Sequence, residues 1–304
     1  MDLTPTFARY LAKRPEHTVA SDSILCLGAG GFHRMRYYEW GDRSNARVVI
    51  CVHGLTRNGR DFDFLAQSLS SDFRVVCPDV VGRGTSDWLA AKDDYAYPQY
   101  LADLTALIAR ITAQGAATID WVGTSMGGLL GMFMAAQPNN PIRKMVINDA
   151  GLLVPKAALE RLALYVGRDP RFPTFDALLA HVKSVAAPFG PHSDEQWHHL
   201  AVHSARQFPD GSWGFLYDPA IGRAFQGALH DVDLSAVWDA VRCPTLLLRG
   251  EHSDLLSRAT AEAMTERGPR ARLVEFKGVG HAPTLLHRPQ IDIVRDFLLE
   301  TTSL

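Results

Sequence analysis

Short apolar runs alternate with stretches of helical periodicity along most of the chain. Mostly apolar runs of four or five residues occur at 48–52, 73–77, 118–122, 144–147, 245–248 and 273–276. Runs of this kind are typical of strands that are buried on both faces of a sheet. Helices are predicted between and after them, where apolar residues either recur at helical spacing or fill the segment, at 62–69, 97–111, 127–136, 258–266 and 291–299.

Repeated alternation of strand and helix predicts an α/β fold, with a mainly parallel central sheet flanked by helices on both faces. Ahead of this part, residues 24–27 and 33–40 flank a glycine-rich turn at 28–31, which predicts a hairpin. The first twenty or so residues have a mixed character that is compatible with a peripheral helix.

Residues 152–238 interrupt the alternation, because they contain helical stretches, prolines and many aromatic residues but no clear strand. In open α/β folds ligands bind at the carboxyl edge of the sheet, and an insertion between two core strands projects from that edge. We therefore predict a helical cap at 152–238, inserted between a first core part at 1–151 and a second core part at 239–304. Some of its aromatic side chains should face the cleft, which favours a largely apolar ligand.

Composition narrows the possible partners. Apolar residues make up 47% of the 304 residues, and 31 basic residues stand against 33 acidic ones, for a net charge of -2. Without a basic excess, neither nucleic acid nor an anionic membrane is an expected partner. The four cysteines form no C-x-x-C pair, so neither a zinc site nor a disulfide framework is predicted.

Two segments bear on location. Residues 121–142 carry no charge and are about long enough to cross a bilayer, but their prolines, glycines and polar residues fit strand, turn and buried helix better. The N-terminus shows no apolar core followed by a small-residue cleavage site. We therefore expect a cytoplasmic protein.

The pentapeptide Gly-Thr-Ser-Met-Gly at 123–127 fits the pattern G-x-S-x-G. It follows the predicted strand at 118–122 and opens a predicted helix, which is the strand–turn–helix context that a nucleophilic serine requires in this pattern. The turn is tight, so small residues must flank the serine. We predict that Ser125 is a catalytic nucleophile; the alternative is a glycine-rich turn without chemistry.

A serine hydroxyl needs a base to take its proton. Among the 12 histidines, His281 is the best candidate, because it is flanked by glycines in a loop just past the predicted strand at 273–276. The acid that orients this base should follow an earlier strand. We predict Asp254, after the strand at 245–248; Glu251 is a nearer alternative, and Asp149, after the strand at 144–147, is a more distant one.

Acyl transfer also needs two backbone N–H donors for the developing oxyanion. The predicted strand at 48–52 runs into His53 and Gly54, so the N–H of Leu55 is one expected donor. The N–H of Met126, the residue after the nucleophile, is the other. His53 is expected to brace the loop through hydrogen bonds.

These pieces together resemble the α/β-hydrolase superfamily over nearly the whole chain. The landmarks are His-Gly-Leu at 53–55, a D-x-x-G-x-G-x-S loop at 79–86, the serine motif at 123–128, and Gly-His at 280–281. The resemblance implies an esterase-like or lactonase-like serine hydrolase with a helical cap. Haloalkane dehalogenases and epoxide hydrolases carry an aspartate at the nucleophile position, where this chain has Ser125.

The expected reaction is hydrolysis of a small to medium, largely apolar carboxylic ester through an acyl-enzyme, without a cofactor or a metal ion. A lactonase, a thioesterase or a carbon–carbon bond hydrolase could use the same three residues, and a ligand receptor on the same fold is an alternative of another class. His199 and His203 share a helix face, as metal ligands can, but no H-E-x-x-H motif is present. A solvated cap helix, beginning near Ser193 with a capping box to Gln196, is the preferred interpretation.

Overall fold

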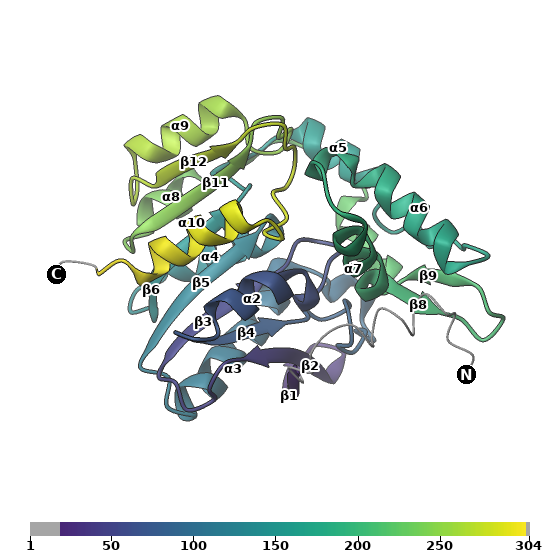
Figure 1. The fold of residues 1–304 in the computed structure, drawn as a ribbon, viewed down its shortest axis with the longest axis horizontal. Coiled ribbons are helices and arrows are strands. Elements are labelled where there is room, and N and C mark those ends of the chain that lie inside the picture. The colour runs from purple at the N-terminus through teal and green to yellow at the C-terminus, as the bar shows by residue number, and fades with distance from the viewer. Residues whose placement is uncertain (1–18, 302–304) are drawn as a thin grey trace.

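The computed structural model describes residues 19–301, so the helix predicted for the first twenty residues lies almost wholly outside the described residues. Its main feature is an eight-stranded sheet in the order β1-β2-β4-β3-β5-β6-β11-β12 (Figure 1). The first two strands form the predicted hairpin and pair antiparallel, as do β2 and β4, and all other neighbours are parallel. The strands are β1 (Ala20–Gly28), β2 (Gly31–Trp40), β3 (Arg47–Val52), β4 (Arg74–Pro78), β5 (Thr118–Thr124), β6 (Ile142–Asn148), β11 (Thr245–Gly250) and β12 (Arg272–Phe276).

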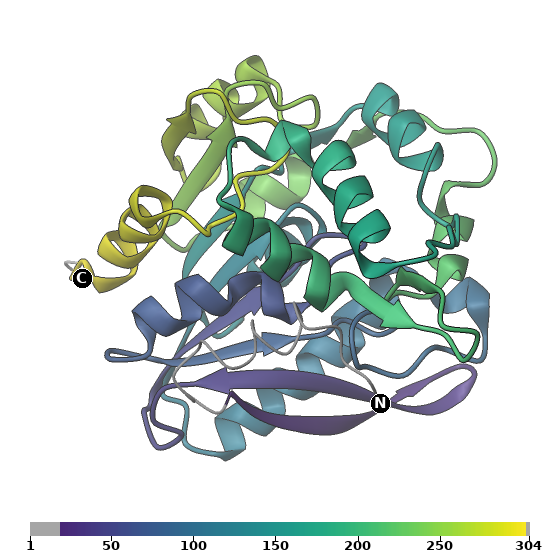
Figure 2. The same cartoon turned by 45° about the vertical axis from the view of Figure 1, so that its right-hand side comes forward.

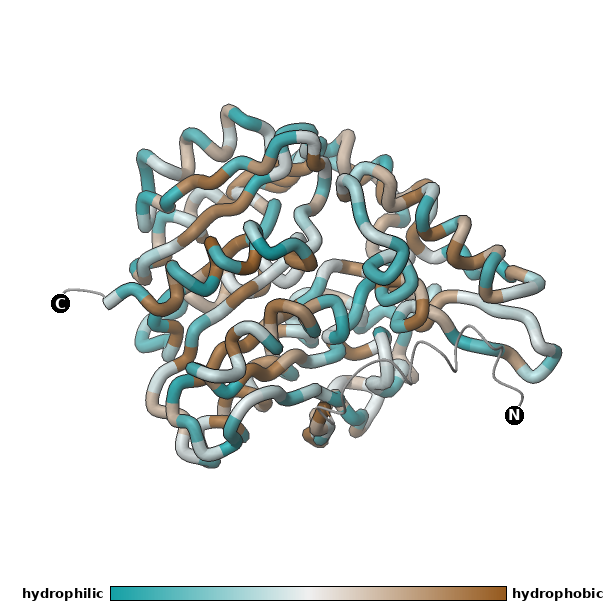
Figure 3. Tube along the Cα trace, viewed as in Figure 1, coloured by the Kyte–Doolittle hydropathy of each residue, from teal (hydrophilic) through white to brown (hydrophobic). Residues whose placement is uncertain are grey.

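Helices cover both faces of this sheet. Successive side chains of each central strand point to opposite faces, and because these side chains are apolar, both faces pack against helices. In β3, Val49 and Cys51 pack in one apolar cluster with α2 (Asp63–Leu69) and α10 (Arg288–Leu299). Ile50 packs in a second cluster on the other face. That cluster includes residues of α3 (Tyr97–Ala113), α4 (Met126–Ala135), α8 (Ser235–Ala240) and α9 (Arg258–Glu266). Figure 3 shows the apolar positions gathered along the central strands, and the predicted α/β architecture is confirmed.

The segment between β6 and β11 lies beside one end of the sheet, as Figures 1 and 2 both show. Its longer helices are α5 (Lys156–Ala163), α6 (Phe175–Val185) and α7 (Asp194–Ser204). The sequence gives no clear strand in this segment, but short strands pair within it. These are β7 (Leu153–Val154) with β10 (Val232–Asp233), and β8 (Ala205–Gln207) with β9 (Trp213–Phe215).

Helix α7 begins as predicted, with Ser193 as its N-cap and a capping box to Gln196. The expected solvation of this helix is wrong, however. His199 is fully buried and its Nε2 lies 2.9 Å from the backbone oxygen of Arg60 in the core. The helix is therefore part of the interface between the inserted segment and the core.

Backbone hydrogen bonds tie the inserted segment to core loops. Gly84 donates its N–H to the oxygen of Leu216 at 2.9 Å, and Gly280 donates to the oxygen of Pro188 at 2.6 Å. The inserted segment thus touches the loop after β4 and the loop after β12. No helix within residues 19–301 is both long and apolar enough to cross a membrane.

Candidate active site

Ser125 lies at the sharp turn between β5 and α4, where the predicted motif placed it. Its backbone has φ 52° and ψ -116°, a conformation that residues other than glycine rarely adopt. Its N–H donates to the backbone oxygen of Asn148 at 2.8 Å. The flanking glycines have no room for a side chain. A Cβ at Gly123 would lie 2.2 Å from the oxygen of Gly127, and a Cβ at Gly127 would lie 2.0 Å from the oxygen of Val52.

His281 reaches Ser125 from the loop after β12. Its Nε2 lies 3.0 Å from Ser125 Oγ, and the ring is half-buried at the end of the sheet. This is the contact that the sequence predicted between a serine and its base, and it has the length of a hydrogen bond.

The carboxylate beside His281 belongs to Asp149, so the prediction of Asp254 in this position is wrong. Asp149 Oδ2 lies 2.8 Å from His281 Nδ1, and Asp149 Oδ1 accepts from the N–H of Gly250 at 3.0 Å. The side chain of Asp254 is 49% exposed and forms an ion pair with Arg161 of the inserted segment. The nearer alternative, Glu251, accepts from the backbone N–H of the loop after β12 and does not reach the His281 ring.

Strand order explains this difference. β6 lies directly beside β5, whereas β11 is one strand further away. Asp149 is the first residue after β6, and its φ of 57° turns the chain sharply there. Asp254 stands four residues beyond the end of β11, on a turn that leads to the surface.

Asn148 ties the three positions together. Its Nδ2 donates to Thr124 Oγ1 at 3.0 Å and to the oxygen of Pro283, in the His281 loop, at 2.7 Å. The nucleophile turn, the Asp149 turn and the His281 loop are therefore connected by direct hydrogen bonds, which limits their relative movement.

The loop after β3 passes close to Ser125, since a Cβ added at Gly54 would lie 3.7 Å from the Cβ of Ser125. The Gly54 oxygen accepts from the N–H of Arg57 at 3.1 Å and lies 2.7 Å from His53 Nδ1. His53 Nε2 accepts the N–H of Val80 at 2.9 Å, so Nδ1 is the atom that carries the proton. Because the two groups of a trans peptide point in opposite directions, holding the Gly54 oxygen fixes the direction of the Leu55 N–H.

Burial keeps His53 neutral. The ring is fully buried, which lowers its pKa from 6.5 to about 3. Both ring nitrogens of His53 form hydrogen bonds, one within this loop and one to Val80, as the predicted bracing of the loop requires.

Met126, the other predicted donor, is the first residue of α4, where backbone N–H groups have no acceptor within the helix.

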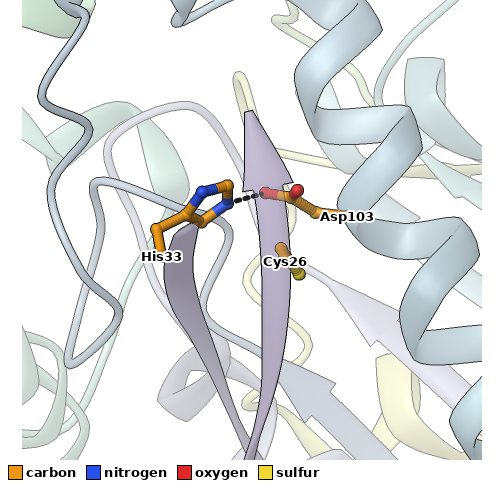
Figure 4. A group of neighbouring side chains, drawn as sticks. All are labelled: Cys26, His33 and Asp103. Carbon is orange, nitrogen blue, oxygen red and sulfur yellow. Dashed lines mark hydrogen bonds and ion pairs between the residues drawn. The ribbon is translucent and has the colours of Figure 1, made fainter. Parts of the chain in front are cut away.

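Among residues 19–301, two groups of side chains outside this arrangement are close enough to hold a metal ion. In one, Cys26, His33 and Asp103 join β1, β2 and α3 at the edge of the sheet, with His33 Nε2 2.9 Å from Asp103 Oδ2 (Figure 4). Burial and the nearby Asp103 carboxylate raise the pKa of the Cys26 thiol to about 12. His33 and Asp103 form a buried pair, which fastens the β1–β2 hairpin to α3.

The second group, Asp63, His199 and His203, lies between α2 and α7. Asp63 already receives two guanidinium nitrogens from Arg60, at 2.8 and 2.6 Å. The charge of the Asp63 carboxylate is therefore already paired with the Arg60 guanidinium. The group therefore fits an interface between the inserted segment and the core.

The sheet order, with a serine at the turn after β5 and a histidine at the loop after β12, defines a hydrolase of the α/β class. Residues 49–294 match the alpha/beta hydrolase family, and the chain belongs to that family. The predicted family and fold class are thereby confirmed.

Similar proteins are known. A 3-hydroxybutyrate-oligomer hydrolase of Cupriavidus necator is 44% identical over 283 residues, which cover 90% of this chain and 96% of the relative. The structure of an alpha/beta hydrolase from Novosphingobium aromaticivorans is 36% identical, with a TM-score of 0.81, and covers 92% of this chain and 99% of that one. The structure of a putative hydrolase from Rickettsia typhi is 28% identical, with a TM-score of 0.86, and covers 94% and 100%.

Proposed function

We propose that this hydrolase cleaves carboxylic esters through an acyl-enzyme on Ser125, with His281 as base and Asp149 as the acid that orients it. The observation that carries the proposal is the double contact of one imidazole. His281 lies 3.0 Å from Ser125 Oγ through Nε2 and 2.8 Å from Asp149 Oδ2 through Nδ1. A carboxylate on Nδ1 keeps the proton there, which leaves Nε2 free to accept the serine proton.

In the first half-reaction the Ser125 Oγ–C bond forms while the Ser125 proton moves to His281 Nε2. The carbonyl oxygen becomes an oxyanion and accepts hydrogen bonds from the N–H groups of Leu55 and Met126. The ester C–O bond then breaks, and His281 Nε2 gives its proton to the departing alcohol. The acyl group remains on Ser125.

In the second half-reaction a water molecule attacks the acyl carbon and gives a proton to His281 Nε2. The oxyanion forms again at the same two N–H groups. When it collapses, the bond to Ser125 Oγ breaks, the acid leaves, and His281 returns the proton to Ser125. The buried Asp149 carboxylate balances the imidazolium charge in both halves.

For the substrate we propose short oligoesters of small hydroxy acids, within the predicted class of small to medium esters. The support is the 44% identical relative, which is a 3-hydroxybutyrate-oligomer hydrolase and is matched over 96% of its length.

The inserted segment at 152–238 is proposed as the cap over this site, because the backbone oxygen of its Pro188 accepts the N–H of Gly280 in the His281 loop. The cysteines are free thiols, which supports the predicted cytoplasmic location.

The test is turnover of a substrate panel by wild type, Ser125→Ala and Ser71→Ala. Ser71 is an exposed serine in the turn before β4, so its variant controls for the substitution itself. The panel contains the 3-hydroxybutyrate dimer and trimer, p-nitrophenyl acetate and butyrate, a thioester and a simple lactone.

We expect wild type and Ser71→Ala to cleave the oligomers with the highest kcat/KM, and Ser125→Ala to be inactive. A preference for the thioester or the lactone would reject the substrate class and keep the mechanism. Folded wild type that binds the oligomers without cleaving any panel member would point to a ligand receptor and reject the proposal.

A further inference from the structure

Arg83 is a fully buried arginine whose hydrogen-bond partners within residues 19–301 are all neutral. Its Nε donates to the oxygen of Leu55 at 2.8 Å and its Nη1 to the oxygen of Val81 at 2.8 Å. Its Nη2 lies 3.8 Å from Met126 Sδ. The positive charge is thus surrounded by backbone oxygens and a thioether.

The other arginines that are buried within residues 19–301 have carboxylate partners. Arg74 is paired with Glu39, and Arg249 with Glu275. Burying a charge without an opposite charge costs free energy that the fold must recover elsewhere. Part of it comes from the aromatic ring of Tyr100, whose centroid lies 4.7 Å from the guanidinium carbon. The remaining cost calls for a functional explanation.

The location of Arg83 provides one. Two of its three hydrogen-bond partners are Leu55 and Met126, the residues whose N–H groups are the proposed oxyanion donors. An arginine stays charged even when buried. In a site shielded from water, a fixed positive charge favours the state in which negative charge develops, and it needs no rearrangement when the reaction occurs.

We infer that Arg83 is a positioning residue of the oxyanion hole, holding Leu55 and Met126 in place and supplying a buried positive charge that stabilises the tetrahedral intermediate. The inference rests on the proposed function. Arg83 does not reach the reacting atoms itself, since it acts through the two residues that it contacts.

The same residue receives the inserted segment. The backbone of Arg83 forms an antiparallel bridge with Tyr217, and the neighbouring Gly82 oxygen accepts the N–H of Asp218 at 2.8 Å. The backbone of this loop therefore holds the inserted segment, while its arginine side chain points inward to the donors. Arg83 therefore contacts the inserted segment through its backbone and the proposed oxyanion hole through its side chain.

The experiment compares Arg83→Met and Arg83→Lys with Arg74→Met, which removes a buried arginine remote from Ser125. For each variant, kcat and KM are measured with p-nitrophenyl butyrate, and kcat is corrected for the fraction of sites that a fluorophosphonate labels. The Ki for an alkyl trifluoromethyl ketone and the urea midpoint of unfolding are measured as well. The ketone carries an oxyanion once Ser125 has added to it, so its Ki reports stabilisation of that charge.

For Arg83→Met we expect kcat to fall about 10- to 100-fold with KM changed less than about threefold, since direct loss of one oxyanion donor costs about 100- to 1000-fold. Ki for the ketone should rise by the same factor as kcat falls. Arg83→Lys keeps the charge and should recover part of both quantities. Arg74→Met should lower the urea midpoint and leave kcat and Ki per labelled site unchanged.

An Arg83→Met enzyme that is less stable but has wild-type kcat and Ki per labelled site overturns the inference, because Arg83 would then be structural only. If Arg83→Met does not fold, Arg83→Lys decides in the same way, by whether kcat and Ki change together or not at all. Failure of the proposed function looks different: wild type itself would not be inhibited by the ketone, or Ser125→Ala would still turn over.

Discussion

Replacing Asp149 by asparagine should nearly abolish turnover while leaving the protein folded. The amide would keep the shape of the side chain, and its oxygen could still accept the N–H of Gly250, which lies 3.0 Å from Asp149 Oδ1. The amide NH₂ group would then face His281 Nδ1. That nitrogen would have to accept, so the ring proton would move to Nε2, the atom that lies 3.0 Å from Ser125 Oγ. A protonated Nε2 cannot accept the serine proton.

The size of the effect follows from this wrong tautomer. A change of this kind in a Ser-His-Asp site lowers kcat about 10⁴-fold, which corresponds to about 5 kcal/mol in activation free energy. The matched control is Asp254→Asn. Asp254 is 49% exposed and paired with Arg161, and exposed ion pairs contribute only about 0–1 kcal/mol to stability. Asp254 pairs with Arg161 and not with His281, so Asp254→Asn should keep a kcat close to that of wild type.

The kcat of both variants is measured from the pre-steady-state and steady-state hydrolysis of p-nitrophenyl butyrate. Circular dichroism and urea unfolding show whether each variant is folded. The reasoning is refuted if folded Asp149→Asn retains kcat within about tenfold of wild type, where about 10⁴-fold is expected. It is equally refuted if Asp254→Asn loses several orders of magnitude, because the acid would then be the residue first predicted from the sequence.

Two further predictions concern stability. The pKa of His53 is lowered to about 3 in the folded protein. Below the usual value of 6.5 the unfolded state therefore binds a proton that the folded state does not, and the free energy of unfolding decreases as the pH is lowered. Between about pH 6.5 and about pH 5 wild type should lose about 1–2 kcal/mol more than His53→Gln in urea unfolding, and parallel losses would contradict the assigned neutral His53. Gly127→Ala should cost about 3 kcal/mol or more or prevent folding, because its Cβ would lie 2.0 Å from the oxygen of Val52. Gly211→Ala, with φ +84° and open space around it, should cost only about 1–2 kcal/mol in thermal or urea unfolding; similar losses in both variants would show that crowding at Gly127 is not the cause.

The sequence was informative wherever an element is long and its pattern strong. The central strands are apolar on both faces, so β3, β5 and β11 could be predicted within a few residues of their bounds. The positions of Ser125 and His281 followed from the motif and from chain order. Their mutual contact at 3.0 Å agrees with that prediction.

The predictions that failed depended on spatial order. Chain order alone cannot say that β6, and not β11, is the neighbour of β5. Asp149 had a usable signal, because it directly follows an apolar strand, whereas Asp254 stands four residues beyond its strand. The strands of the inserted segment are two or three residues long, which is too short for any alternation to show.

Burial of polar residues was equally hidden. The sequence predicted a solvated cap helix around His199, yet this side chain is fully buried against the core. Arg83 lies within the D-x-x-G-x-G-x-S loop at 79–86, one of the landmarks of the family resemblance. Its contact with Leu55 joins positions 28 residues apart in the chain, and no local pattern contains that information.

The central claim is that a covalent acyl group is carried by Ser125. The most direct measurement is the intact mass of the protein after rapid acid quenching of its reaction with p-nitrophenyl butyrate, followed by peptide mapping. The account predicts a butyryl adduct on the peptide that contains Ser125 in wild type, and none on the corresponding peptide of Ser125→Ala. Turnover without any adduct on this peptide, or an unchanged adduct in Ser125→Ala, would contradict it.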